Sequence, residues 1–151
     1  MSLSDQVNEA IKTAMKQKNQ AALRALRAIK SALLLAQTEK AGATVDAAKE
    51  LQLLQKLAKQ RRDSMEIYQA QNRQDLFQLE AEELALIEQF LPKQLDETEV
   101  KTRLTLLLKE AGASSPSDLG RMMPLAMKTF EGQADNKLIA TVLKNLLSRQ
   151  A

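Results

Sequence analysis

The sequence contains no histidine, no cysteine and no tryptophan, and only four glycines and three prolines among 151 residues. Without thiols and imidazoles the chain cannot form a disulfide, a cysteine nucleophile, a histidine acid–base pair or an ordinary zinc site. We therefore predict no catalytic residue, no metal and no cofactor. Aromatic residues make up 3% of the chain, so aliphatic residues, methionine and alanine must form the core, as in many helical proteins.

Long apolar runs are missing as well. The longest run covers residues 32–36, whereas a membrane-spanning helix needs about 20 residues. The N-terminus lacks the basic and then apolar layout of a secretion signal, and the lack of cysteine fits a reducing compartment. We expect a cytoplasmic protein that does not contact a membrane.

The small net charge of +3 is unevenly distributed. Residues 1–75 carry 13 Lys and Arg against 8 Asp and Glu, whereas residues 76–151 carry 9 against 11. A basic half can attract nucleic acid or an acidic partner, and the alternative is an ordinary solvated helix surface.

Helical periodicity extends over most of the first 91 residues, where apolar side chains recur at spacings of three and four. Asn19 breaks the first helix, and Gly42–Thr44 ends the second. Thr44 or Asp46 is a suitable cap for a long third helix. A fourth helix is predicted from about Asp75 to Leu91, where Pro92 stops it.

The remaining residues predict three more helices. Asp96 precedes a helix over 97–111 that ends at Gly112. Ser115, Pro116 and Asp118 form a helix start with an N-cap, a first-position proline and a third-position acid. The prediction is therefore an all-α fold: an N-terminal helical hairpin or bundle over 1–94, then a compact three-helix unit over 95–151.

Arg61 falls within the apolar stripe of the third predicted helix. A guanidinium in this position needs a partner, and Asp75, Glu80 and Glu83, at the start of the next predicted helix, are the nearest candidates. We interpret Arg61 as half of an ion pair between two helices, and the alternative is a contact with a phosphate or RNA. Arg62 and Lys59 lie further round the helix and are predicted to face solvent or a partner.

The N-terminal half also carries a basic series in its first two helices. Arg24 and Arg27 lie one turn apart, so together they can hold a phosphate. No aromatic residue is interleaved with them, which favours contact with the nucleic-acid backbone over reading of bases. The series consists of Lys12, Lys16, Lys18, Arg24, Arg27 and Lys30.

Helix-breaking residues concentrate between Asp118 and Asp135. Pro124 cannot donate to the carbonyl of Gly120, which predicts a kink or a helix split in two at 121–124. Gly132 is predicted to end this helix in the left-handed conformation, and Asp135 to cap the last helix.

Five segments together resemble the YqeY family, and the match covers essentially the whole chain. These are Lys-Gln-Arg-Arg-Asp-Ser at 59–64, Arg-Gln-Asp-Leu at 73–76, Phe-Leu-Pro-Lys-Gln-Leu at 90–95, Asp-Leu-Gly-Arg-Met-Met at 118–123 and Gly-Gln-Ala-Asp at 132–135. The family is related to the tail domain of the B subunit of the bacterial aspartyl/glutamyl-tRNA amidotransferase, which helps hold tRNA.

The resemblance implies a non-catalytic, tRNA-associated accessory module that works with tRNA or with an amidotransferase or synthetase. The alternatives are a protein-interaction module and a carbon–nitrogen ligase that uses glutamine as the amido donor. The candidate RNA-contacting residues are Arg24, Arg27, Lys59, Arg62, Arg121 and Lys128. The family-motif residues with a structural role are Arg61, Asp75, Gly120, Gly132, Ala134 and Asp135.

Overall fold

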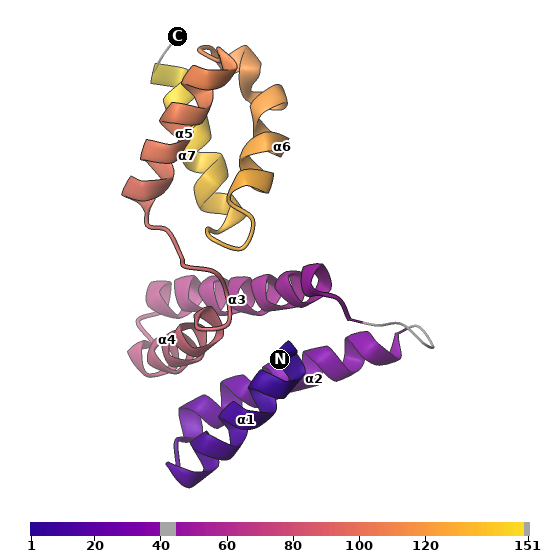
Figure 1. The fold of residues 1–151 in the computed structure, drawn as a ribbon. Helices are drawn as coiled ribbons and strands as arrows, with labels where there is room; N and C mark the ends of the chain where they lie inside the picture. Colours follow the sequence, from indigo (N-terminus) through magenta and orange to yellow (C-terminus); the bar gives the residue numbers. More distant parts are fainter. Residues whose placement is uncertain (40–44, 150–151) are drawn as a thin grey trace. The chain divides into compact units, whose positions relative to one another are not determined.

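The computed structural model describes residues 1–39 and 45–149, and all regular structure in these ranges is helical (Figure 1). This confirms the predicted all-α class, with a helical bundle followed by a three-helix unit. By its contacts the chain forms two compact units, the first Met1–Pro92 and the second from Lys93 onward. No helix in the described ranges is long and apolar enough to cross a membrane.

The first unit consists of two helical hairpins that pack against each other. Its helices are α1 (Leu3–Lys16), α2 (Gln20–Thr38), α3 (Ala47–Ala70) and α4 (Gln74–Glu88). α1 packs on α2, α4 packs on both α2 and α3, and α2 meets α3 over a shorter stretch. Their shared core includes Leu26, Ile29, Leu54 and Ile87, each at most 3% exposed.

Side-chain caps determine where the helices of this unit begin. Ser2 caps α1, the Asn19 side chain accepts from the amide of Ala22 at 3.1 Å to cap α2, and the Asp46 side chain accepts from the amide of Lys49 at 2.8 Å to cap α3. Asn19 thus separates α1 from α2 as predicted. The expected stop at 42–44 and the alternative cap Thr44 lie outside the described residues.

The predicted end of α4 was wrong by three residues. The helix ends at Glu88 and not at Leu91, because the amides of Gln89, Phe90 and Leu91 each bond to the carbonyl three residues earlier. Phe90 and Leu91 then pack against the core of the first unit. The chain has thus left the regular α-helix before it reaches Pro92.

The second unit is built around its last helix. It contains α5 (Glu97–Ala111), the 3₁₀ turn η1 (Pro116–Asp118), α6 (Leu119–Thr129) and α7 (Asn136–Arg149). α7 contacts α5, α6 and η1. The buried core centres on Phe130, which is 0% exposed, with Leu104, Met122 and Leu143 equally buried.

The start and end of α5 agree with the prediction. Asp96 accepts from the amide of Glu99 at 2.8 Å, and Gly112 ends the helix in the left-handed region with φ 67°. A side chain at Gly112 would be strained there, since L-residues avoid this region.

Two expectations for α6 were wrong. The helix is not split near Pro124, because α6 continues through this residue to Thr129; the change of helix type lies earlier, where η1 passes into α6. The alternative of a kink at 121–124 stays a prediction. Gly120, in the first turn of α6, has open space around the position of a Cβ, with no atom within 4 Å. α6 also ends before Gly132, with Phe130 as the C-cap, although Gly132 does adopt the predicted left-handed conformation, with φ 79°.

A matched pair of glycine substitutions tests this description. We expect Gly112→Ala to lower the free energy of unfolding by about 1 kcal/mol through left-handed strain. Gly120→Ala should raise it by about 0.5 kcal/mol, because the helix is unstrained there and the unfolded chain loses freedom. Urea unfolding followed by circular dichroism measures both, and a loss at Gly120 as large as that at Gly112 would contradict the structure.

Candidate functional site

Three cations follow one another at single-turn spacing along the exposed face of α2. These are Arg24, Arg27 and Lys30, and all three are exposed. Arg24 forms an ion pair of 3.6 Å with Glu82 of α4, in which both side chains are about 40% exposed. Arg27 and Lys30 form no ion pair with any described residue. The first unit therefore presents two uncompensated charges next to a third that is held only by a solvated pair.

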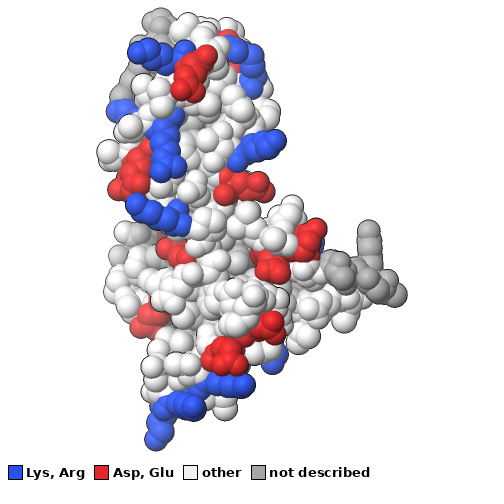
Figure 2. Space-filling view, viewed as in Figure 1, with Lys and Arg blue, Asp and Glu red and all other residues white. Residues whose placement is uncertain are grey.

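More positive charge surrounds the turn between α1 and α2. Lys16 ends α1, and Lys18 lies in the turn with φ 55°, a conformation that places it outside the helix. Neither forms an ion pair with the described chain, whereas Lys12 pairs with Glu9 at 3.3 Å. Figure 2 shows basic side chains gathered over this turn. The turn thus extends the positive surface of α2.

The cations in the second half of α3 are less available. Lys59 pairs with Asp63 of the same helix at 3.2 Å, and Arg62 pairs with Glu88 of α4 at 3.4 Å. The Arg62 pair is about one-third exposed or less on both sides. The helix period alone predicted that Arg62 faces solvent or a partner. The structure instead places Arg62 in an ion pair with Glu88.

Arg61 joins α3 to α4. Its guanidinium lies 3.9 Å from the carboxylate of Glu83, and each side chain is 15% exposed. The Nε atom of Arg61 is buried without a hydrogen-bond partner. Of the three acids that the sequence offered, Glu83 is the partner.

The other two acids have different surroundings. Burial, together with the nearby charge of Glu83, raises the pKa of Glu80 above its ordinary 4.5, and Arg61 offsets only part of this rise. Asp75 pairs with Arg73 at 3.0 Å, and the hydrogen bond from Arg73 lowers the pKa of the Asp75 carboxyl. Asp75 thus belongs to the turn that starts α4 and not to the Arg61 pair.

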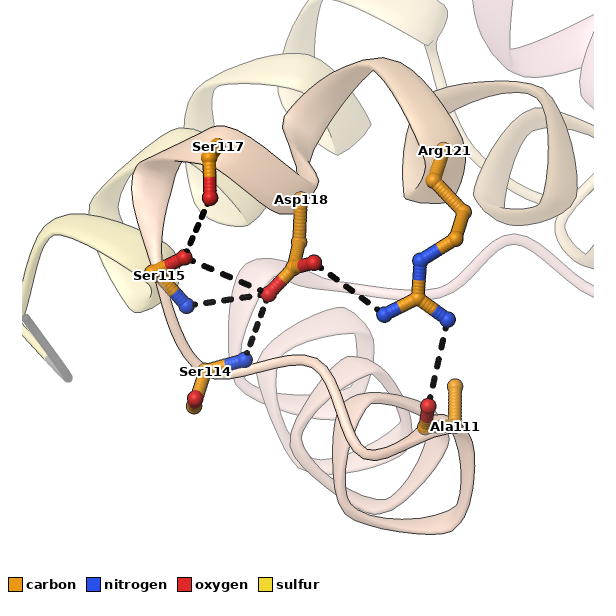
Figure 3. A network of polar contacts seen from close by, with 6 residues as sticks. All are labelled: Ala111, Ser114, Ser115, Ser117, Asp118 and Arg121. Carbon is orange, nitrogen blue, oxygen red and sulfur yellow. Dashed lines mark hydrogen bonds and ion pairs between the residues drawn. The ribbon is translucent and has the colours of Figure 1, made fainter.

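In the second unit, Asp118 collects the hydrogen bonds at the start of η1 and α6 (Figure 3). Its carboxylate accepts from the amides of Ser114 at 2.9 Å and Ser115 at 3.2 Å, and from Arg121 at 3.1 Å. These three contacts lower the pKa of Asp118 below its ordinary 3.8. The arrangement is a helix cap, and it leaves the carboxylate well satisfied.

Arg121 is held by this cap. A second nitrogen of its guanidinium donates to the carbonyl of Ala111 at 3.2 Å, so Arg121 ties the start of α6 to the end of α5. Lys128 is exposed in the last turn of α6 and has no ion-pair partner among the described residues. Arg24, Arg27, Lys59 and Arg62 belong to the first unit, so the six candidate cations are divided between two units.

The loop at 132–135 has a structural partner that the sequence reasoning missed. The carbonyl of Gly132 accepts from the side chain of Gln94 at 2.7 Å, and the carbonyl of Gln133 accepts from the amide of Leu95 at 2.8 Å. Gly132 has φ 79°, which a glycine adopts without strain. Ala134 is buried next to this turn, at 8% exposed. These bonds join the segment before α5 to the segment before α7.

Asp135 directly precedes α7, and its carbonyl accepts from the amide of Ile139 at 3.1 Å. This is the N-cap position that the sequence predicted. The only sequence signal for the Gln94 contact was that two of the five family segments contain these residues; nothing in either segment points to the other.

The described residues offer little for metal or buried-site chemistry. No group of three carboxylates there is arranged to hold a metal ion, and every side chain that is buried in the described ranges is apolar or a glycine. The polar groups that stand out are cations on helix surfaces and carboxylates in caps and ion pairs.

The fold is thus a helical bundle followed by a three-helix unit, with its candidate site formed by surface cations. The family model of Yqey-like proteins matches residues 4–147, and the chain belongs to this family. Comparison with curated proteins gives no match.

Asp118 predicts an acid-dependent loss of stability. Since its pKa is lowered in the folded protein, its contribution is complete above the ordinary 3.8 and is lost as the pH falls through the lowered value. We expect Asp118→Asn to lower the melting temperature at neutral pH, and this deficit should shrink below pH 3.8. The control Ser117→Ala, which loses only a contact with Ser115, should retain the pH dependence of the unmodified protein. If the melting-temperature deficit of Asp118→Asn were constant with pH, this role of Asp118 would be contradicted.

Glu80 predicts the opposite dependence of stability on pH. Since its pKa is raised in the folded protein, the charged form costs stability at neutral pH, and this cost disappears below the ordinary 4.5. We expect Glu80→Gln to raise the melting temperature at neutral pH but not at a pH below 4.5. Glu82→Gln, which loses the pair with Arg24, is the matched control and should give no gain at either pH.

Proposed function

We propose that this YqeY-family protein is a non-catalytic accessory module that associates with tRNA, in the manner of an amidotransferase tail. Family membership supports the proposal, as does the exposed positive surface of α2 and of the α1–α2 turn. The absence of histidine and cysteine from the sequence agrees with a binding role.

The observation that carries the proposal is the uncompensated pair Arg27 and Lys30. Each is exposed on α2 without an ion-pair partner in the described chain, and Arg24 is one turn away. Cations at this spacing, about 4.5 Å of rise apart, can contact successive phosphates along a backbone. Such contacts provide affinity and orientation but no sequence reading.

Aromatic side chains support the same type of contact. The four aromatic residues are Tyr68, Phe77, Phe90 and Phe130, and none of them is in the exposed class. Base stacking requires exposed aromatic faces. We therefore propose recognition of the folded phosphate backbone of tRNA and not of an unpaired base.

The remaining candidate cations take secondary parts in this proposal. Lys59, Arg62 and Arg121 are held by carboxylates and would have to leave or share them to reach a phosphate. Lys128 is unpaired among the described residues and gives the second unit its own phosphate contact. We assign the main contact to α2.

A protein-interaction role is the second candidate function, and a groove between α2 and α3 favours it. The groove is lined by apolar side chains of both helices and by two lysines of α3. Ligase chemistry with glutamine is the remaining alternative, and no side chain in the described ranges has surroundings that favour it.

Titration with tRNA at several salt concentrations tests the proposed function. Binding should weaken as salt rises, because each phosphate contact releases counterions. We expect Arg27→Ala with Lys30→Ala to weaken binding at low salt and to reduce the slope of log K against log salt by about 2, one for each lost contact.

The matched control is Arg103→Ala with Lys109→Ala on α5, which removes two exposed and unpaired cations from the second unit. This control should leave the salt slope within about 0.5 of the unmodified protein. No binding of tRNA at low salt, or an equal loss in both double variants, would refute the proposed contact.

A further inference from the structure

An open groove lies between the second half of α2 and the first half of α3. α3 has 24 residues and α4 has 15, so that α3 is longer by about 14 Å. α4 ends at Glu88, whose carboxylate reaches Arg62 in the second half of α3. The first half of α3 extends past the end of α4, and its residues from Lys49 to Gln60 line a groove against α2.

The groove has an apolar interior of about 340 Å³. Its base is formed by small residues of α2, Ala32 and Ala36, opposite Leu53 and Leu57 of α3. Leu35 lies at the edge of the groove and is 64% exposed, which is a large solvent-exposed apolar surface. An apolar trough between two helices, without a third helix over it, is the shape that receives an amphipathic helix.

The charges on its rim are mostly positive. Lys49 and Lys56 line the α3 side and lie seven residues apart, about 10 Å along the helix. Both are exposed, and neither forms an ion pair with a described residue. The single acid that lines the groove, Glu39, is on the opposite side, at the C-cap of α2.

We propose that this groove binds an acidic amphipathic helix of a partner protein. The lining of α3 runs from Lys49 to Gln60, about 17 Å, which corresponds to a helix of about three turns. The partner helix places apolar side chains at three and four spacing in the trough. Carboxylates two turns apart on one of its flanks pair with Lys49 and Lys56.

A second copy of this chain is a poorer occupant. Its densest run of glutamates is in α4, where Glu82, Glu83 and Glu88 already pair with arginines of the same unit. A different protein can supply carboxylates that have no such internal partner.

The inference goes beyond the proposed binding of tRNA. At 100° per residue, Arg27 and Lys30 project from the side of α2 opposite Ala32 and Ala36. One helix therefore presents a cationic side and a side facing the groove, and both can be occupied at once. The protein then acts as an adapter between an RNA and a protein.

Photo-crosslinking identifies the occupant. A photoreactive residue replaces Gln52, which lines the groove, in the full chain expressed in the cell of origin, and the crosslinked segment is sequenced by mass spectrometry. We expect crosslinks to a helical, acidic segment of another protein. The control position is Gln69, an exposed glutamine on the same helix, where this crosslink should not form. Crosslinks to a second copy, to a non-acidic segment, to a lipid or to nothing would overturn the proposal.

Titration of a synthetic peptide of that segment measures the contacts. Lys49→Glu with Lys56→Glu should weaken binding about tenfold or more, and Leu35→Glu by a similar factor. The control Leu34→Glu changes a neighbouring exposed leucine that does not line the groove, and Lys30→Glu changes the RNA side; both should stay within about twofold. Equal binding by all variants would overturn the proposal, whereas a loss of tRNA binding in Lys30→Glu alone would leave it standing.

Discussion

The first unit depends on how α4 is held between α2 and α3. Three ion pairs between helices of this unit end on α4, at Glu82, Glu83 and Glu88. Ile87, 0% exposed, anchors the same helix in the core. Burial provides most of the free energy. The Arg61–Glu83 pair, in which each side chain is 15% exposed, adds to the packing of α3 on α4, since loss of either residue would leave the other charge without its ion-pair partner.

This arrangement also determines where the positive charge of the first half remains. α4 neutralises Arg24, Arg61 and Arg62, which a simple count of charges would include in the basic surface. The cations that remain lie on two different surfaces: one on α2, the other along the groove beside α3. The uneven charge of the sequence therefore becomes two separate patches and not one broad basic face.

The features that were predicted correctly from the sequence are those that depend on contacts between residues close together in the chain. The caps Asp46 and Asp96 and the stop at Gly112 each act within about four residues, so their patterns are legible in the chain. The end of α4 lies three residues before the predicted one, because the following amides bond to the carbonyl three residues earlier, and periodicity does not reveal this change. Likewise the partner of Arg61 had to be selected from three acids by tertiary geometry, and the bonds from Gln94 and Leu95 span 38 residues.

Those last bonds have a consequence for synthesis on the ribosome. The segment that enters α5 is tied to carbonyls of Gly132 and Gln133, and α7, the helix that the other elements of the second unit contact, comes later still. The second unit therefore cannot complete its core until α7 has emerged. The first unit has all its helices by Glu88 and can fold earlier, as N-terminal domains generally do.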